Sequence, residues 1–334
     1  MPVLRAAILL AALCFIKPPG GSPADVPIHR SDFLLNTFVD IAIYDSRDES
    51  ILDGAMALCR EYENRFSRTL SGSEVYRLNH REDATGTYPL SDDMTDLLAT
   101  ALYYCERSGG AFDITTEPLS SLWNFSGTSP SVPPAEAIEE ARKKVDYKKL
   151  RLDGTRSTLT FLDPGTSIDL GAIAKGYIAD QLKAYLLDSG VESAMINLGG
   201  NVLCVGSRPD GTPFTVGLQK PFADRNETFA QVEVSDLSVV ASGVYERHFV
   251  EDGKNYHHIL DPSTGYPYDN GLISVTILSE RSVDGDALST TCFSLGLSRG
   301  MELVESMDGV YACFIDEDYQ IHYSDGMEKF LRKD

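Results

Sequence analysis

The chain has 334 residues, of which 43% are hydrophobic and 24% charged, a composition typical of a globular protein with a buried core. It carries 29 Lys and Arg against 50 Asp and Glu, a formal net charge of −21. Because binding to nucleic acid or to anionic lipid depends largely on Lys and Arg, this charge argues against a nucleic-acid partner.

The first 28 residues are predicted to be a signal peptide or membrane anchor followed by a tether. Arg5 precedes an apolar run at residues 6–16, which has the length of a signal-peptide hydrophobic region and is short for a bilayer span. Cys14 follows a sequence that resembles a bacterial lipoprotein box, except that Leu13 stands where a small residue is expected. We therefore expect a folded domain at residues 29–334 that works outside the cytoplasm, anchored to the outward face of the bacterial inner membrane.

The first half of the folded domain opens with a strand and two helices. Alternation at Val39, Ile41 and Ile43 predicts a half-buried strand. A helical stripe follows, made of Leu52, Met56, Cys59 and Tyr62. Residues 66–79 are expected to be a polar stretch, and a second helix begins near the N-capping Ser91 and ends at residues 108–110. A third, charged helix is expected at residues 135–145.

The second half alternates short strands with two helices. Strands are expected at residues 158–162, 194–198, 214–218, 229–234 and 272–278, with helices opening at 169–176 and covering 285–296. Residues 310–315 and 320–323 are expected to form a closing hairpin-like pair. Strands in series with inserted helices favour an α+β fold with antiparallel sheet over a doubly wound parallel sheet.

The six cysteines form no C-x-x-C pair and no regular spacing, which excludes a zinc ribbon or a disulfide-stapled small fold. They are Cys14, Cys59, Cys105, Cys204, Cys292 and Cys313. Those on apolar helix faces are expected to be small buried hydrophobic residues.

Asp286 and Thr290 are four residues apart in an expected helix, so they share one face. A carboxylate and a hydroxyl are hard oxygen ligands of the kind that Mg²⁺ takes when it also binds phosphates. The alternative is plain capping, with Asp286 near the helix start and Thr290 bonded back one turn.

Asp169 and Lys175 flank the expected start of another helix. Asp169 has a structural alternative as the helix N-cap. Lys175 lies among Gly171, Ala172, Ala174 and Gly176, where small side chains let a ligand approach the backbone. Since helix N-termini attract phosphates, these residues indicate a phosphate-binding corner.

Two further segments contain polar groups next to turns. Residues 197–201 close a strand in a glycine turn that matches neither a dinucleotide fingerprint nor a phosphate-binding loop. His258 precedes a turn fixed by Pro262 and Gly265, and because histidine changes charge near neutral pH it is a candidate general base. A structural role for His258 is the alternative.

Six blocks, in this order, resemble one family, the ApbE-type FAD:protein FMN transferases, also called flavin-trafficking lipoproteins. They are SGSEVYRLN at 71–79, GAFDIT at 110–115, DLGAIAKG at 169–176, NLGGN at 197–201, HILDPSTG at 258–265 and DALST at 286–290. The sequence departs from the family pattern at residues 35–37, where Leu-Asn-Thr replaces the usual Met-Gly-Thr.

The resemblance implies Mg²⁺-dependent transfer of FMN from FAD to a Ser or Thr hydroxyl of an acceptor protein, with release of AMP. It places Mg²⁺ on the Asp286 carboxylate, the Thr290 hydroxyl and the Ala172 carbonyl, with His258 as the base. It assigns FAD contacts to Ala111, Phe112, Asp113, Asp169, Lys175 and the backbone at Leu260. It also implies an α+β, ApbE-like (T-fold-like) architecture of two related lobes with the flavin in the cleft between them.

The expected acceptors are membrane-bound redox subunits exposed outside the cytoplasm. Two other activities stay open: an Mg²⁺-dependent FAD pyrophosphatase that yields FMN and AMP, and a non-catalytic extracytoplasmic flavin carrier. We expect Asp286→Ala to abolish turnover with little loss of fold, because the polar face of its helix is not predicted to be core.

Overall fold

The computed structural model describes residues 26–83, 85–125, 127–224 and 227–333. The expected signal sequence and Cys14 therefore lie outside the described residues. Within the described ranges, no helix is both long enough and apolar enough to cross a membrane.

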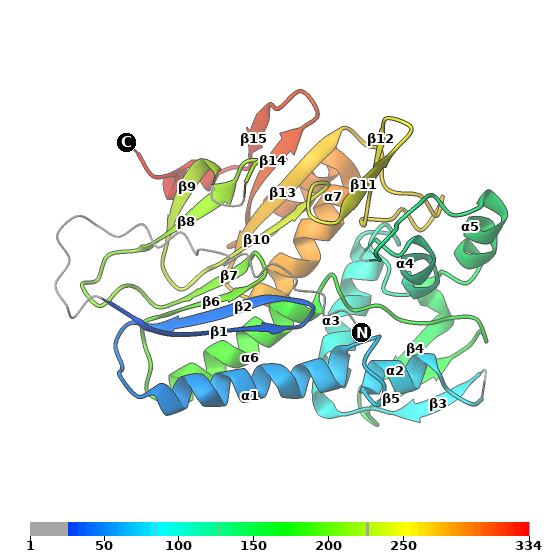
Figure 1. Ribbon diagram of the computed structural model, residues 1–334, viewed down its shortest axis with the longest axis horizontal. Helices are drawn as coiled ribbons and strands as arrows, with labels where there is room; N and C mark the ends of the chain where they lie inside the picture. The colour runs from blue at the N-terminus through cyan, green and yellow to red at the C-terminus, as the bar shows by residue number, and fades with distance from the viewer. Residues whose placement is uncertain (1–25, 84, 126, 225–226, 334) are drawn as a thin grey trace, which may run out of the picture.

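An eight-stranded sheet forms the larger part of the molecule (Figure 1). Its strands, in order across the sheet, are β1 (Ile28–Leu34), β2 (Thr37–Ile43), β6 (Ala194–Leu198), β7 (Asn201–Val205), β10 (Ser238–Gly243), β13 (Leu272–Ser279), β14 (Tyr311–Asp316) and β15 (Ile321–Tyr323). Every neighbouring pair is antiparallel. The prediction of an antiparallel α+β fold is thus confirmed.

Three helices cover one face of this sheet: α1 (Glu49–Phe66), α6 (Ala174–Asp188) and α7 (Ser282–Glu305). Figure 1 shows α1 and α6 side by side below the sheet. The predicted stripe of α1 is buried in the main core against the apolar side chains of β2. The opposite face is covered by the hairpin of β8 (Phe214–Gln219) and β9 (Thr228–Val234) and by the short helix η3 (Met327–Phe330). The large sheet is therefore the middle of three layers.

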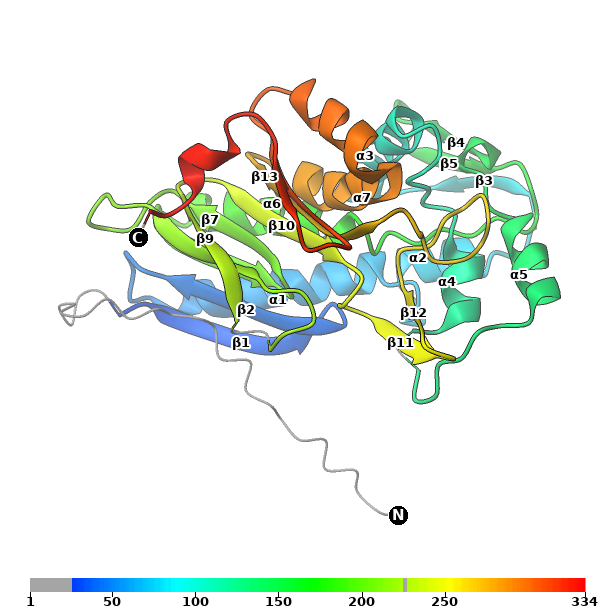
Figure 2. The ribbon, with the colours of Figure 1, turned by 90° about the horizontal axis from the view of Figure 1, so that it is seen from above.

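The remaining elements gather at one end of the helices, on the right of Figures 1 and 2. The helices there are α2 (Glu74–Asn79), α3 (Asp92–Arg107), α4 (Glu117–Trp123), α5 (Ala135–Arg142) and η2 (Tyr147–Lys149). The strands are β3 (Gly86–Pro89), β4 (Leu150–Asp153) and β5 (Thr158–Phe161) in one small sheet and β11 (His248–Glu251) with β12 (Lys254–His257) in another. This part joins the larger one through α3, whose Tyr104 hydroxyl donates to Asp284 of α7 at 2.9 Å.

Several predicted boundaries differ from the structure. The polar stretch at 66–79 contains helix α2, because the Ser73 side chain caps it by accepting the Tyr76 N–H. The helix expected at 285–296 starts earlier, at Ser282, and resumes after Gly296, where φ is +78°. The strand at 158–162 and the closing pair β14–β15 lie where predicted, within a residue or two.

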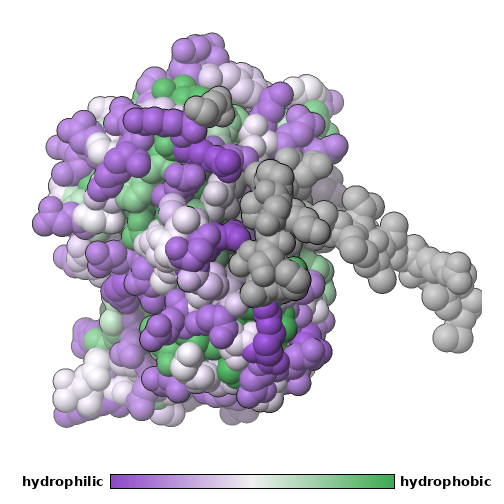
Figure 3. All heavy atoms as spheres, turned by 90° about the vertical axis from the view of Figure 1, so that its left-hand side faces the viewer, coloured by the Kyte–Doolittle hydropathy of each residue, from purple (hydrophilic) through white to green (hydrophobic). Residues whose placement is uncertain are grey.

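The five described cysteines are buried and free, as expected of small hydrophobic residues. Burial raises the pKa of Cys59, Cys204, Cys292 and Cys313 to about 12, which keeps these thiols protonated. At the end of the molecule seen in Figure 3, apolar residues form small groups separated by hydrophilic ones.

Candidate active site

The candidate site lies where the first turn of α6 meets the second turn of α7. Gly176 makes this contact possible, because a Cβ there would lie 2.3 Å from the Ser282 carbonyl oxygen. The Gly176 N–H donates to Asp286 Oδ2 at 2.9 Å, and Lys175 Nζ lies 3.4 Å from Asp286 Oδ1. Residues 169–176 thus bring the Gly176 amide and the Lys175 ammonium group to Asp286, the predicted metal ligand.

A second carboxylate, on α6, accepts N–H groups from the start of α7. Asp180 on α6 accepts the N–H groups of Ser282 and Val283, which open α7, at 2.8 and 2.9 Å. Since the first N–H groups of a helix have no partner within it, each helix supplies the other with a cap. Asp180 was missed in the sequence, where no local pattern links it to Ser282, 102 residues away.

Asp286 is only 4% exposed, and the structure does not support the alternative of Asp286 capping its own helix with Thr290 bonded back one turn. It does not cap its own helix, whose N-cap is Arg281 without a side-chain hydrogen bond. The Thr290 hydroxyl lies 3.2 Å from Ser242 Oγ at the end of β10. The expectation that Asp286 lies on a non-core face is wrong, because the close approach of α6 covers it.

The oxygen atoms of this corner fit the chemistry of Mg²⁺. The Gly176 amide, which a regular helix would pair with the Ala172 carbonyl, donates to Asp286 instead, whereas the next amide, that of Tyr177, donates to the Ile173 carbonyl at 3.2 Å. One carboxylate with a hydroxyl and a carbonyl is a small hard-oxygen set, of the kind that Mg²⁺ completes with water and phosphate. Among the described residues no group of three or more His, Cys, Asp or Glu side chains could hold a metal ion.

Asp169 does not cap α6, so this expectation is wrong: the N-cap residue is Ile173 and has no side-chain bond. Instead Asp169 Oδ1 accepts the Gly171 N–H at 2.9 Å, which fixes the turn before the helix. Asp169 Oδ2 lies 3.2 Å from Arg68 Nε, which also places a guanidinium group beside this turn. Arg68 was missed in the sequence because it belongs to the polar stretch and lies 101 residues from Asp169.

In the segment Ala111 to Asp113, the side chains of Phe112 and Asp113 face the protein interior. Phe112 is 4% exposed, and Asp113 accepts bonds from Thr115 N–H at 2.7 Å and from Tyr147 N–H at 2.9 Å. Burial raises the pKa of Asp113, against the opposing effect of these hydrogen bonds. A ligand would therefore meet the backbone of this segment rather than the Asp113 carboxylate.

This segment is joined directly to the α6 corner. The Ile114 carbonyl accepts the Asp169 N–H at 2.8 Å, so two of the six blocks are hydrogen-bonded neighbours.

His258 follows β12 directly, and its N–H donates to the Arg247 carbonyl at 3.1 Å. Loss of solvation, followed by the charges of Arg247, His257 and Lys175, lowers the pKa of His258 to about 3. Lys175 of the α6 corner is thus one of the charges that act on this imidazole. Nδ1 of His258 is buried and has no hydrogen-bond partner in the described part of the chain.

The low pKa of His258 contradicts the expectation that this histidine changes charge near neutral pH. The ring is neutral at neutral pH, as a base must be, but its charge does not change there. Leu260, two residues later, is buried and bridges to Pro267, so its backbone holds the turn that follows. The assignments of His258 and Leu260 stay predictions.

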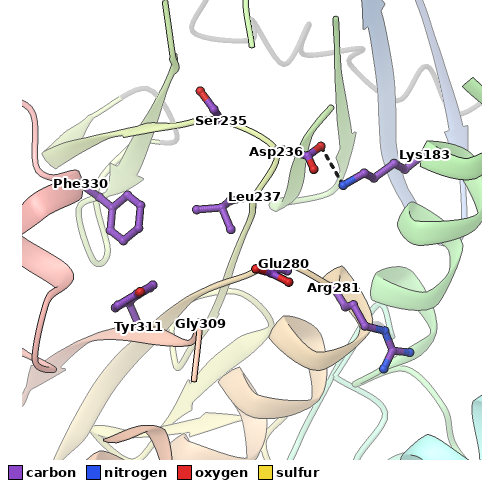
Figure 4. Close-up of a pocket in the computed structure, with 9 residues that line it drawn as sticks. All are labelled: Lys183, Ser235, Asp236, Leu237, Glu280, Arg281, Gly309, Tyr311 and Phe330. Carbon is purple, nitrogen blue, oxygen red and sulfur yellow. Dashed lines mark ion pairs between the residues drawn. The ribbon is translucent and has the colours of Figure 1, made fainter. Parts of the chain in front are cut away.

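Figure 4 shows a hollow beside the residues that precede α7 and the later turns of α6. It is lined by Lys183, Ser235, Asp236, Leu237, Glu280, Arg281, Gly309, Tyr311 and Phe330. Lys183 lies eight residues beyond Lys175, about 12 Å along α6, and is paired with Asp236 at 2.8 Å. The hollow does not include any residue assigned to the metal or the flavin.

Comparison with known proteins decides the family. A sequence model of the ApbE family matches residues 35–315, most of the chain. The chain belongs to the ApbE family. The departure at residues 35–37 therefore does not remove it from the family.

This ApbE chain is similar to proteins named FAD:protein FMN transferase. It is 37% identical over 293 residues to one from Klebsiella pneumoniae (strain 342), covering 87% of this chain and 90% of that protein. It is 32% identical over 347 residues to one from Treponema pallidum (strain Nichols), covering 98% and 95%.

Two solved structures share the fold. The ApbE protein of Thermotoga maritima superimposes with a TM-score of 0.83 at 32% identity, covering 92% of this chain and all of that one. The flavin transferase ApbE of Vibrio cholerae gives a TM-score of 0.81 at 27% identity, covering 91% and 99%. The expected ApbE-like fold is confirmed.

Proposed function

We propose that this chain is an FAD:protein FMN transferase that acts on a Ser or Thr hydroxyl of an acceptor protein. The observation that carries the proposal is its similarity to transferases of that name over nearly the whole chain. The α6 corner supports it, since a carboxylate, an ammonium group and helix amides meet there within hydrogen-bonding distance.

The reaction exchanges one phosphorus–oxygen bond for another. The acceptor oxygen forms a bond to the FMN phosphorus, the bond from that phosphorus to the bridging oxygen breaks, and AMP leaves with the bridging oxygen. The hydroxyl proton goes to a base. Such transfers depend mainly on positioning and charge stabilisation, so few protein groups are needed.

Asp286, Thr290 and the Ala172 carbonyl would hold Mg²⁺, which neutralises charge on the phosphates when bound. Lys175 supplies a second positive charge, and the first turn of α6 adds the partial charge of a helix N-terminus. A chain with a net charge of −21 can hold the FAD diphosphate only through such local positive charge. Arg68 contributes another cation at the Asp169 turn.

His258 would accept the proton of the acceptor hydroxyl. Without ligand its pKa is about 3, which makes it a weak base. Loss of solvation and nearby positive charges lower this pKa, so a diphosphate bound beside Lys175 would offset part of their effect and raise the pKa. The ligand itself would then make the imidazole a better proton acceptor.

We also propose that the protein works outside the cytoplasm, anchored by residues 1–28. The apolar run at 6–16 and the Cys14 sequence support this proposal. Its acceptors would be membrane-bound redox subunits that expose a Ser or Thr on the same side of the membrane.

Incubation with FAD, Mg²⁺ and a candidate acceptor tests the function. We expect covalent flavin on the acceptor, detected by in-gel fluorescence and mass spectrometry, together with one AMP per flavin attached. FMN and AMP formed equally fast without acceptor would favour the pyrophosphatase. Intact FAD after long incubation with acceptor and Mg²⁺ would favour the carrier and contradict the proposal.

A further inference from the structure

Tyr268 contacts two separate segments of the candidate site. Its hydroxyl donates to the Ala111 carbonyl at 2.9 Å. Its backbone N–H donates to the Ile259 carbonyl at 3.0 Å, and its carbonyl lies 3.0 Å from His257 Nε2. One residue thus joins the predicted flavin segment, residues 111–113, to the loop that carries His258.

The peptide group between Ala111 and Phe112 is held at both of its polar atoms. The Phe112 N–H donates to Ser108 Oγ at 3.0 Å, while the Ala111 carbonyl, on the same peptide, accepts the Tyr268 hydroxyl. Both polar atoms of that peptide are therefore held by side chains, and its plane cannot rotate without breaking a bond.

Two glycines precede this peptide. Gly109 and Gly110 have φ angles of +65° and +88°, a left-handed region that glycine enters at low cost, and their N–H groups donate to the Glu106 and Cys105 carbonyls at 3.0 and 2.8 Å. The Tyr268 bond comes from 157 residues away and is the long-range restraint on the Ala111 carbonyl. Burial raises the pKa of Tyr268, so its hydroxyl keeps the proton that it donates.

We propose that the Tyr268 hydroxyl is a positioning group that orients the Ala111–Phe112 peptide for binding FAD. The link to FAD rests on the proposed function, whereas the restraint on the peptide does not. Because the side chains of Phe112 and Asp113 are buried, a ligand can contact only the backbone of this segment. The hydrogen bond from Tyr268 fixes the orientation of the Ala111 carbonyl in that backbone.

Tyr268→Phe removes the hydroxyl and keeps the ring. Tyr185→Phe is the matched control, because its hydroxyl also donates to a backbone carbonyl, that of Ile51 at 3.2 Å, between α6 and α1. A net hydrogen bond corresponds to a factor of about 2 to 10 in an equilibrium constant. We expect Tyr268→Phe to raise the KM and Kd for FAD by about that factor, with kcat within about twofold of wild type, and Tyr185→Phe to change none of them.

Hydrogen exchange of the ligand-free protein supplies a second measurement. We expect the amides of residues 110–113 to exchange about 2 to 10 times faster in Tyr268→Phe than in wild type or Tyr185→Phe. Unchanged exchange there, or equal FAD affinity in both variants, would overturn the proposal. If wild type binds no FAD while exchange is faster in Tyr268→Phe, the proposed function and the link to FAD fail and only the restraint on the peptide stands.

Discussion

The structure gives Asp286 one role and the proposed function gives it a second, and two substitutions separate them. Its Oδ2 accepts the buried Gly176 N–H, which holds α6 against α7, and its negative charge is what a bound Mg²⁺ would require. Asn at this position keeps an oxygen of the same shape that can accept the Gly176 N–H, but it has no charge. Ala keeps neither property.

The expected stability changes follow from these contacts. Asp286→Ala leaves the Gly176 N–H buried without a partner, which costs about 1–3 kcal/mol. The ion pair with Lys175 adds little, because its 3.4 Å separation is long and the Lys175 side chain is 26% exposed. We expect Asp286→Asn to stay within about 1 kcal/mol of wild type, since the main hydrogen bond is kept.

Urea denaturation in the presence of a chelator measures these free energies of unfolding without any contribution from metal. Titration of activity with Mg²⁺ measures the second role. Loss of a hydrogen bond to a metal-binding residue lowers metal affinity about 10- to 100-fold. Loss of the charged ligand itself should therefore lower the affinity for Mg²⁺ by at least about 100-fold in both variants. Near-normal Mg²⁺ dependence in Asp286→Asn would refute the metal assignment, and wild-type stability of Asp286→Ala would refute the helix contact.

Three further outcomes are expected. Gly176→Ala should destabilise the protein by about 1–3 kcal/mol, because its Cβ would overlap the Ser282 carbonyl. The control is Gly154→Ala, whose Cβ meets nothing within 4 Å and which should be near neutral in the same urea experiment. Lys175→Gln should raise the Kd for FAD, measured by flavin fluorescence, about 10-fold or more and make that Kd less sensitive to salt. An unchanged salt dependence would contradict the proposed contact between Lys175 and the FAD diphosphate. Burial lowers the pKa of His257 from 6.5 to about 4, so the unfolded chain takes up its proton first and stability falls as pH drops below 6.5. From pH 6.5 to 5 wild type should lose about 1.5 kcal/mol more than His257→Gln, and equal losses would contradict that shift.

The sequence predicted those parts of the fold in which one element carries its own signal. The stripe on α1 is buried as expected, and Ser91 caps α3 as expected, because side chains three to four residues apart determine both features. Strands β11 and β12 were missed because each has four residues and no alternation of apolar with polar side chains. The start of α6 was misplaced because its N-cap, Ile173, carries no capping side chain and Asp169 offered a false signal.

The candidate site was predicted only as far as local spacing reaches. Asp286 and Thr290 lie one helical turn apart, and that pairing needs no knowledge of the fold. The contacts that give the site its shape join residues about 100 or more positions apart, such as Gly176 with Asp286 and Ala111 with Tyr268. No periodicity reports such contacts, because they arise from how helices and loops pack rather than from propensity. The ordered blocks identified the family, whereas the structure was needed to find Asp180, Arg68 and Tyr268.

The exchange of carboxylates between α6 and α7 explains how an acidic protein can hold this site together before any ligand binds. Asp286 and Asp180 each lie at the N-terminal end of the opposite helix, where N–H groups and the helix dipole stabilise negative charge. Each carboxylate therefore accepts at least one helix N–H, which opposes the effect of burial that raises the pKa of Asp180. The ammonium group of Lys175, 26% exposed and at a long distance from Asp286, is left available for an anion. Because helix amides bond to both acids and the Lys175 side chain stays partly exposed, this corner can attract a diphosphate in spite of the net charge of −21 of the whole chain.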